Sequence, residues 1–334
     1  MSLLSDAFLS NFAKRNIMFK KWIKFELVIV LLIAITSLAE SCKSNNEEHS
    51  KDLAINEEVS EETIQKKELS TEFKEYWYAG EAEITSYKLE QARYGEMRKG
   101  TAVLIYVTEP FLPEKQTKAD GNNSNNIPVL KLNSTKNYLT GIYPYSIMSS
   151  SFYPVHDNSQ AIKVAFSSQE WCGQVYAQLN NREKFDVMSH SYFESEADQT
   201  VKIDKNILEN ELWNKIRINP EELPVGDMKV VPSLEYIRLS HKELKAYDAT
   251  LTLTKNNEVS SYEVSYPELK RKLRIDFLTV FPHSIEGWSD TFESGYGNGK
   301  KELTSTATKI KSLKSPYWQK NSNEFLPLRD SLGL

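Results

Sequence analysis

The feature that most constrains the fold is a series of strand-like runs, rich in hydroxyl, aromatic and β-branched residues, between Ala82 and Leu313. Such runs, with one face apolar and one wet, are typical of antiparallel sheets. The long helical pattern is confined to Lys205–Arg217, where four aliphatic residues recur at helical spacing. We therefore predict a mainly β (α+β) fold: long antiparallel strands in a curved sheet or half-barrel, with one packed helix near 205–217.

Individual elements follow from the same patterns. A short amphipathic helix is expected from Leu69 to Trp77, and a hairpin from runs 82–93 and 101–109 around a glycine-bounded turn. Two longer runs, 170–179 and 185–203, are joined by a polar turn. Further strands are expected at 129–132, 140–155, 161–166, 229–239, 244–254, 261–266, 272–280 and 301–313.

The stretch Met18–Cys42 has the layout of an export signal. Three lysines precede an apolar run, Leu27–Ala39, that is shorter than the roughly 20 residues a bilayer-spanning helix needs. The run ends at Glu40-Ser41-Cys42, which resembles a relaxed bacterial lipoprotein signal in which Cys42 is lipidated. The alternatives are a signal cleaved elsewhere, with Cys42 incidental, or an uncleaved anchor.

These features divide the chain into four parts. Residues 1–17 are interpreted as an extension from a start codon assigned too early, and 18–41 as the lipoprotein signal peptide. Residues 42–70 are expected to be the lipidated cysteine and a disordered acidic tether, because Lys43–Ser70 holds eight acidic and four basic residues and no aromatic. Residues 71–334 are predicted to form a single β-rich globular domain.

The charge of the chain limits the classes of molecule that it is expected to bind. A formal net charge of −5 gives no basic excess of the kind that nucleic-acid binding needs.

Lipidation of Cys42 would attach the protein to a membrane of the cell envelope. We expect the outer membrane, on its periplasmic face or at the cell surface. The sequence does not distinguish the two leaflets.

Four segments carry a resemblance to a known family: Glu83–Glu109, Thr140–Val155, Gln169–Asp198 and Leu208–Gly226. They resemble envelope lipoproteins of unknown function from flavobacteria (Bacteroidetes), and the similarity covers nearly all of 73–334. Some members carry the label "septum formation inhibitor Maf". The Maf motif and its α/β alternation do not occur in this sequence.

The sequence lacks the strongest catalytic and cofactor motifs: the dinucleotide and phosphate loops, the zinc-protease helix, the nucleophile elbow and the paired cysteines. We therefore expect no cofactor and no metal. The remaining candidate is Cys172 on one run with His190 and Glu194 on the next, which a suitable turn would bring to one sheet face. The competing interpretation is a lone small hydrophobe and a solvated strand face.

An aromatic set gives the candidate ligand-binding residues. Its members are Tyr143, Tyr145, Trp171, Tyr176, Tyr192 and Trp213. They would line an apolar cavity under the helix, or simply form the core between helix and sheet. Three hypotheses result: a non-enzymatic lipoprotein binding a lipid or other hydrophobic ligand, a scaffold docking to another envelope protein, and a hydrolase or metal site using Cys172, His190 and Glu194.

Overall fold

The computed structural model of the chain describes residues 67–121 and 123–334, so the predictions for 1–66 lie outside the described residues. Within these residues, sixteen strands form one sheet, which runs from β10 at one edge to β9 at the other and is not closed. Every neighbouring pair is antiparallel except β10 and β11, which are parallel. The prediction of a mainly β protein with a curved antiparallel sheet is confirmed.

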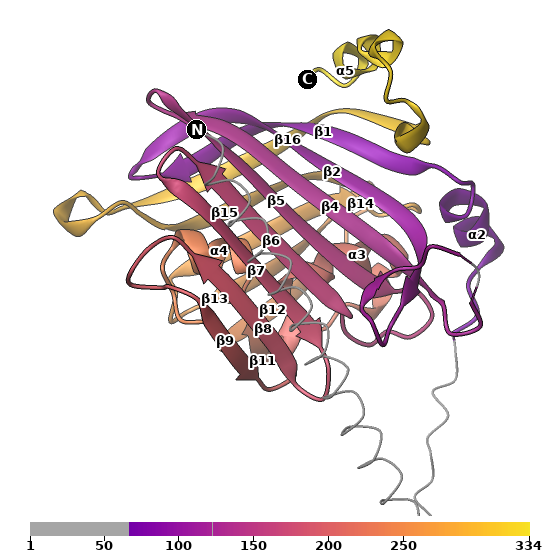
Figure 1. Cartoon of the computed structure of the whole chain (residues 1–334), viewed down its shortest axis with the longest axis horizontal. Helices are drawn as coiled ribbons and strands as arrows, with labels where there is room; N and C mark the ends of the chain where they lie inside the picture. Colours follow the sequence, from indigo (N-terminus) through magenta and orange to yellow (C-terminus); the bar gives the residue numbers. More distant parts are fainter. Residues whose placement is uncertain (1–66, 122) are drawn as a thin grey trace, which may run out of the picture. The chain divides into compact units, whose positions relative to one another are not determined.

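The strands pair mostly in chain order, so hairpins account for most of the sheet (Figure 1). Two chain-distant strands, β1 and β16, meet at its centre. In order, the strands are β1 (Ala82–Arg93), β2 (Glu96–Leu112), β3 (Thr117–Lys118), β4 (Ile127–Thr140), β5 (Tyr143–Pro154), β6 (Lys163–Glu170), β7 (Gly173–Asn181), β8 (Phe185–Ser191), β9 (Gln199–Ile203), β10 (Ile207–Leu208), β11 (Gly226–Val231), β12 (Tyr247–Thr254), β13 (Val259–Tyr266), β14 (Arg271–Leu278), β15 (Ile285–Ser294) and β16 (Lys301–Ser315).

Helices in the described part of the chain are short. They are α2 (Thr71–Trp77), α3 (Glu209–Ile218), α4 (Leu234–Leu239), α5 (Pro327–Ser331) and the 3-10 turns η1 (Pro220–Glu222), η2 (Gly297–Gly299), η3 (Tyr317–Gln319) and η4 (Asn323–Phe325). Serine caps begin two of them: Ser70 accepts from the Phe73 amide and Ser233 from the Tyr236 amide. Within residues 67–121 and 123–334, no helix has the length and apolarity to cross a membrane.

The curved sheet has two arms, one that contains β4 and β5 and one that contains β14 and β15. Helix α3 lies between these arms (Figure 1). On one side it contacts β4 and β5. On the other, Trp213 of α3 packs edge to face on Trp288 of β15, with ring centroids 5.3 Å apart. The main hydrophobic core fills the space between helix and arms, and it includes Leu212 and Ile216 of α3. The space at the end of α3 where Glu209 lies holds the pocket described below.

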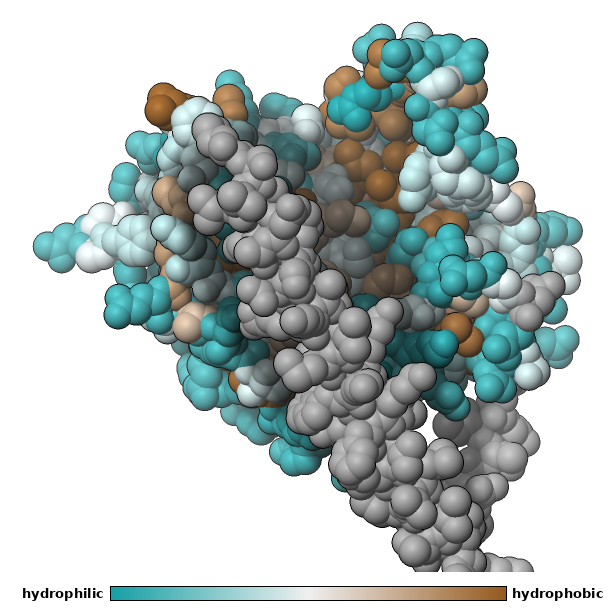
Figure 2. Space-filling view, viewed as in Figure 1, coloured by the Kyte–Doolittle hydropathy of each residue, from teal (hydrophilic) through white to brown (hydrophobic). Residues whose placement is uncertain are grey.

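A smaller hydrophobic cluster joins the C-terminal segment to β1 and β2. Leu332 packs there with Ala82, Ile84 and Val107, and the Ser86 hydroxyl donates to the Leu332 carbonyl. Figure 2 shows hydrophobic residues gathered beneath this segment. The C-terminal residues thus cover apolar surface on the central strands.

The elements depart from prediction at several places. The single run expected at 185–203 is divided by a turn into β8 and β9. The helix expected at 205–217 begins at Glu209, because Ile207 and Leu208 pair with Val230 and Val231 as strand β10. The run expected as a strand at 229–239 contains helix α4. Strand β15 was not predicted at all.

The domain also makes contacts before the predicted boundary at residue 70. The Lys67 amide donates to the His156 carbonyl at 2.7 Å, and Leu69 is buried. These contacts tie the start of the described chain to the turn after β5.

Candidate ligand-binding pocket

A pocket of about 370 Å³ lies on the inner side of the sheet, between α3, α4 and both arms. Strands β4 and β5 line it on one side and β14 and β15 on the other. A volume of this order is within the range of small-molecule sites. The curvature of the open sheet therefore creates an internal ligand-sized space.

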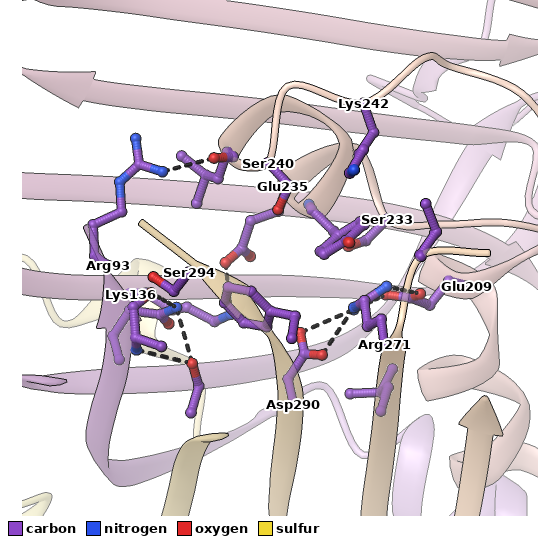
Figure 3. A pocket seen from close by; sticks show the side chains of 18 of the residues that line it. Arg93, Lys136, Glu209, Ser233, Glu235, Ser240, Lys242, Arg271, Asp290 and Ser294 are labelled. Atoms are coloured by element: carbon purple, nitrogen blue, oxygen red, sulfur yellow. Dashed lines mark hydrogen bonds and ion pairs between the residues drawn. The ribbon is translucent and has the colours of Figure 1, made fainter. Parts of the chain in front are cut away.

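Arg271 fixes the charge at one wall of the pocket (Figure 3). Its guanidinium donates to Glu209 at 2.6 and 2.9 Å and to Asp290 at 2.8 and 2.9 Å. Burial opposes ionisation of both acids. For Glu209 the contact with Arg271 outweighs burial and lowers the pKa below its usual range. For Asp290 burial outweighs the same contact, and the pKa is raised. A buried cation between two carboxylates is a fixed structural group.

A second ion pair links α4 to the sheet at the same pocket. The Lys136 ammonium on β4 lies 2.7 Å from the Glu235 carboxylate on α4, and both side chains are largely buried. The largely buried carboxylates that line the pocket are therefore already engaged: Glu209 and Asp290 by Arg271, and Glu235 by Lys136.

Aromatic and aliphatic side chains form the apolar part of the wall. Trp213 and Trp288 make one edge-to-face pair, and Tyr236 and Phe292 make another with centroids 5.9 Å apart. The aliphatic lining residues are Leu132, Leu239, Leu269 and Leu273. This wall offers apolar contact to a ligand.

Three polar atoms of lining residues have no hydrogen-bond partner among the described residues. They are the Ser149 hydroxyl, the Gln91 side-chain carbonyl and the Nε of Arg93, all buried. Buried polar atoms in native structures are nearly always paired. These three atoms are covered by neighbouring protein atoms, so the polar contacts open to a ligand come from the other polar side chains of the lining.

A second pocket of about 310 Å³ adjoins the first. The two share Arg93, Tyr94, Leu239, His241 and Tyr296. Tyr145 lines the second pocket, where its hydroxyl lies 2.6 Å from that of Tyr94. Arg93 therefore stands where the two spaces meet.

The predicted aromatic set does not gather in one place. Trp213 lines the main pocket and Tyr145 the adjoining one. Tyr143 is partly buried between Tyr145 and Trp171, with centroids 6.0 and 6.4 Å away. Trp171, Tyr176 and Tyr192 are 69, 40 and 73% exposed. As ligand-binding residues the six remain predictions, and only Trp213 lines the main pocket.

Cys172, His190 and Glu194 do not converge. The loop between β7 and β8 has the three residues that keep Cys172 and His190 on one face, but the register pairs His190 with Tyr176. Cys172 precedes β7, in the exposed turn after β6, where its amide donates to Glu170 at 2.7 Å. Glu194 is exposed in the turn after β8.

No group of three or more histidine, cysteine, aspartate or glutamate side chains suited to a metal occurs within residues 67–121 and 123–334.

Sequence reasoning missed the charged residues of the pocket. A signal existed for Arg271, because it shares an inward-facing alternation with Leu273, Ile275 and Phe277. A charged residue in such a row predicts a buried, paired cation. Lys136 and Glu235 had no comparable signal, because α4 was taken for a strand.

Comparisons with known proteins add a distant likeness. No protein-family model matches the chain, and no curated protein matches it. Among solved structures, a porin-like protein from Bacteroides uniformis shares 9% sequence identity, over 68% of this chain and 95% of that one, with a TM-score of 0.23. A likeness at that score carries no argument about function.

Proposed function

We propose that the protein is a non-enzymatic envelope lipoprotein whose folded part binds a single-chain amphiphile of the lipid class. The observation that carries the proposal is the pocket between α3, α4 and the two arms, with an apolar wall beside charged and polar side chains. An apolar chain would contact Trp213, Trp288 and Phe292. A polar group would meet the charged and polar side chains of the lining.

The charges of the pocket favour binding over catalysis. A general base needs a carboxylate or imidazole free to take a proton. Glu209, Glu235 and Asp290 each contact a cation at 2.6 to 2.9 Å, and the imidazole of His241, which also lines the pocket, lies 2.7 Å from Glu196. Because these groups are already paired, they act as structural parts of the pocket wall and are not free to serve as a base.

Native mass spectrometry tests the proposal directly. The protein is purified from its own membrane and sprayed under mild conditions. We expect a retained small molecule, absent after delipidation, whose binding Trp213→Ala weakens and Trp318→Ala leaves unchanged. Trp318 is 45% exposed and outside the pocket, so it controls for loss of a tryptophan. No retained mass, together with no saturable uptake of added lipid, contradicts the proposal.

Anchorage through Cys42 completes the proposal, and it is supported by the signal-like stretch Met18–Cys42 and by the resemblance to flavobacterial lipoproteins. Two acyl chains at about 0.8 kcal/mol per buried methylene would hold the protein stably. Cys42→Ala should abolish fatty-acid labelling and release the protein from membranes. Persistent labelling contradicts this anchorage.

A docking scaffold is the second candidate, and the exposed hydrophobic side chains at the sheet turns favour it. Ile142, Trp171 and Tyr192 are 83, 69 and 73% exposed and follow β4, β6 and β8. Consecutive antiparallel hairpins bring those strand ends to the same end of the sheet. Trp171→Ser with Tyr192→Ser should then release an envelope protein partner without changing lipid retention.

A further inference from the structure

The mouth of the pocket, where it adjoins the second pocket, contains Arg93, a cation that has no anionic partner among the described residues. Arg93 ends β1, is partly buried and lines both adjoining pockets. Its guanidinium donates to the Leu239 carbonyl at 2.7 Å and to the hydroxyls of Tyr94 and Tyr145 at 3.1 and 3.2 Å. All three acceptors are neutral. The buried Nε of Arg93 has no acceptor within residues 67–121 and 123–334.

The other arginines of the interior are neutralised. Arg217 contacts Glu83, and Arg271 contacts Glu209 and Asp290. Arg238, which lines the second pocket, contacts Glu196 at 2.9 Å. Taking a charge out of water is costly unless it is paired. Arg93 is thus the pocket arginine without a carboxylate within 4 Å among the described residues.

Two lysines extend the positive charge at the mouth. Lys242 after α4 and Lys300 before β16 line the main pocket, are exposed, and have no acidic partner within 4 Å in the described chain. Of the carboxylates nearby, Glu293 lies 3.3 Å from Lys270, and Glu170 of the second pocket has no cationic partner in the described chain, so it offsets one of the three positive charges. The mouth therefore has an excess of positive charge.

The tyrosines add a hydrogen-bond donor to this cluster. The hydroxyls of Tyr94 and Tyr145 lie 2.6 Å apart, so one of them donates to the other. The second phenolic proton is then free. Arg93 also lies over the Tyr94 ring at 4.2 Å, which holds the guanidinium in place.

We infer that Arg93, with Lys242 and Lys300, forms a subsite for the acidic group of the ligand, a carboxylate or a phosphate. The inference rests on the proposed function, because the chain of the amphiphile would lie in the main pocket. A guanidinium attracts such an oxyanion by its charge and by its N–H donors. Both N–H groups of the Arg93 Nη2 go to the tyrosines and one of Nη1 goes to Leu239. The second N–H of Nη1 and the free tyrosine proton therefore supply donors that no described residue uses.

The test is photolabelling of the full-length protein in its own membranes. The probes are a diazirine-bearing fatty acid and its uncharged glycerol ester. Unlabelled oleate, lysophosphatidic acid, monoolein and inorganic phosphate serve as competitors. We expect the acidic probe to half-saturate at a tenfold lower concentration than the neutral probe. Competition by free phosphate alone would identify the source as a free anion at the same subsite.

Three variants decide whether the cluster is responsible. Arg93→Gln and the exposed double variant Lys242→Gln/Lys300→Gln should each raise the half-saturation concentration of the acidic probe at least fivefold, and leave the neutral probe within twofold. Lys311→Gln is the matched control, an exposed lysine of β16 outside both pockets. Circular dichroism confirms folding of Arg93→Gln.

The outcomes separate the two proposals. Equal labelling by both probes, unchanged by all variants, overturns the subsite and leaves the amphiphile pocket standing. An equal loss of both probes in the two mouth variants also overturns it, because the residues would then be structural. Saturable labelling by neither probe overturns the subsite together with the proposed function.

Discussion

Arg217 of α3 and Glu83 of β1 form a bidentate ion pair, with Nη1–Oε1 and Nη2–Oε2 distances of 2.7 and 2.6 Å, in a site where both side chains are almost fully buried. The Arg217 guanidinium also lies over the Trp77 and Tyr106 rings, at 4.9 and 4.6 Å. Burial opposes charge on Glu83, but Arg217 outweighs it and lowers the pKa of that carboxyl. This pair anchors the helix that forms one side of the pocket.

Arg217→Met should therefore lower the free energy of unfolding by about 3 to 5 kcal/mol, because it leaves Glu83 charged and buried without a partner. Urea denaturation measures the loss. Adding Glu83→Leu should recover part of it. The matched control is Lys229→Met, which breaks the exposed pair with Asp248 and should cost under about 1 kcal/mol. Similar losses in the two single variants would contradict a special role for Arg217.

Glu211 should make the free energy of unfolding depend on pH. Burial raises the pKa of this α3 carboxyl to about 7, so the folded state favours its protonated form. Its contribution to stability is complete below its ordinary pKa of 4.5 and is lost as the pH rises toward 7. The full loss corresponds to about 3 kcal/mol.

Glu211→Gln should remove this dependence. The variant should match the wild type at pH 4 and exceed it by up to about 3 kcal/mol at pH 8, measured by urea denaturation. Glu243→Gln, at an exposed site, is the control and should show no such trend. A difference between Glu211→Gln and wild type that stays constant with pH would show that the pKa of Glu211 is the same in the folded and unfolded states, and would contradict the raised pKa.

The sequence predicted the fold class because the alternation in strands such as β14 is regular. Boundaries were less predictable. Strand β4 continues through Asn133–Leu139, a polar stretch in which no strand was predicted, because β2 and β5 pair with it on both sides. Tertiary pairing overrode local composition there.

The candidate site was less accessible to sequence reasoning than the fold. The pocket joins residues from α3, α4 and both arms of the sheet, so its position depends on curvature that no local pattern encodes. Trp213 was found because a large aromatic beside an apolar helical stripe predicts a core or cavity position. Trp171 and Tyr192 are also large aromatic residues and were predicted with Trp213, but they lie at exposed turns.

Gly100 is required by a close approach of β2 and β4. A Cβ at this position would lie 2.2 Å from the Asn137 carbonyl oxygen and 2.7 Å from the Tyr138 Cβ. Gly100→Ala should therefore destabilise the fold by about 1 to 3 kcal/mol in a urea melt. Gly299→Ala is the control, because open space surrounds that position. Equal stability of the two variants would show that β2 shifts freely.

Cys172 should behave as an exposed thiol without structural importance. Cys172→Ser should change the free energy of unfolding by less than about 0.5 kcal/mol and leave lipid retention unchanged. A hydrogen bond from the thiol to Glu170 raises the thiol pKa, so alkylation by iodoacetamide at pH 8 should be slow and Glu170→Gln should accelerate it. Loss of ligand retention in Cys172→Ser with an intact fold would favour the hydrolase or metal hypothesis instead.

The most direct test of the central claim locates the bound chain. Brominated fatty acid is titrated into the domain 67–334 while tryptophan fluorescence is recorded. We predict saturable quenching that Trp213→Phe with Trp288→Phe largely abolishes, and that Trp171→Phe with Trp318→Phe preserves. Quenching that persists in the first pair of substitutions and disappears in the second would place the ligand at the exposed turns, and would contradict an internal pocket as the binding site.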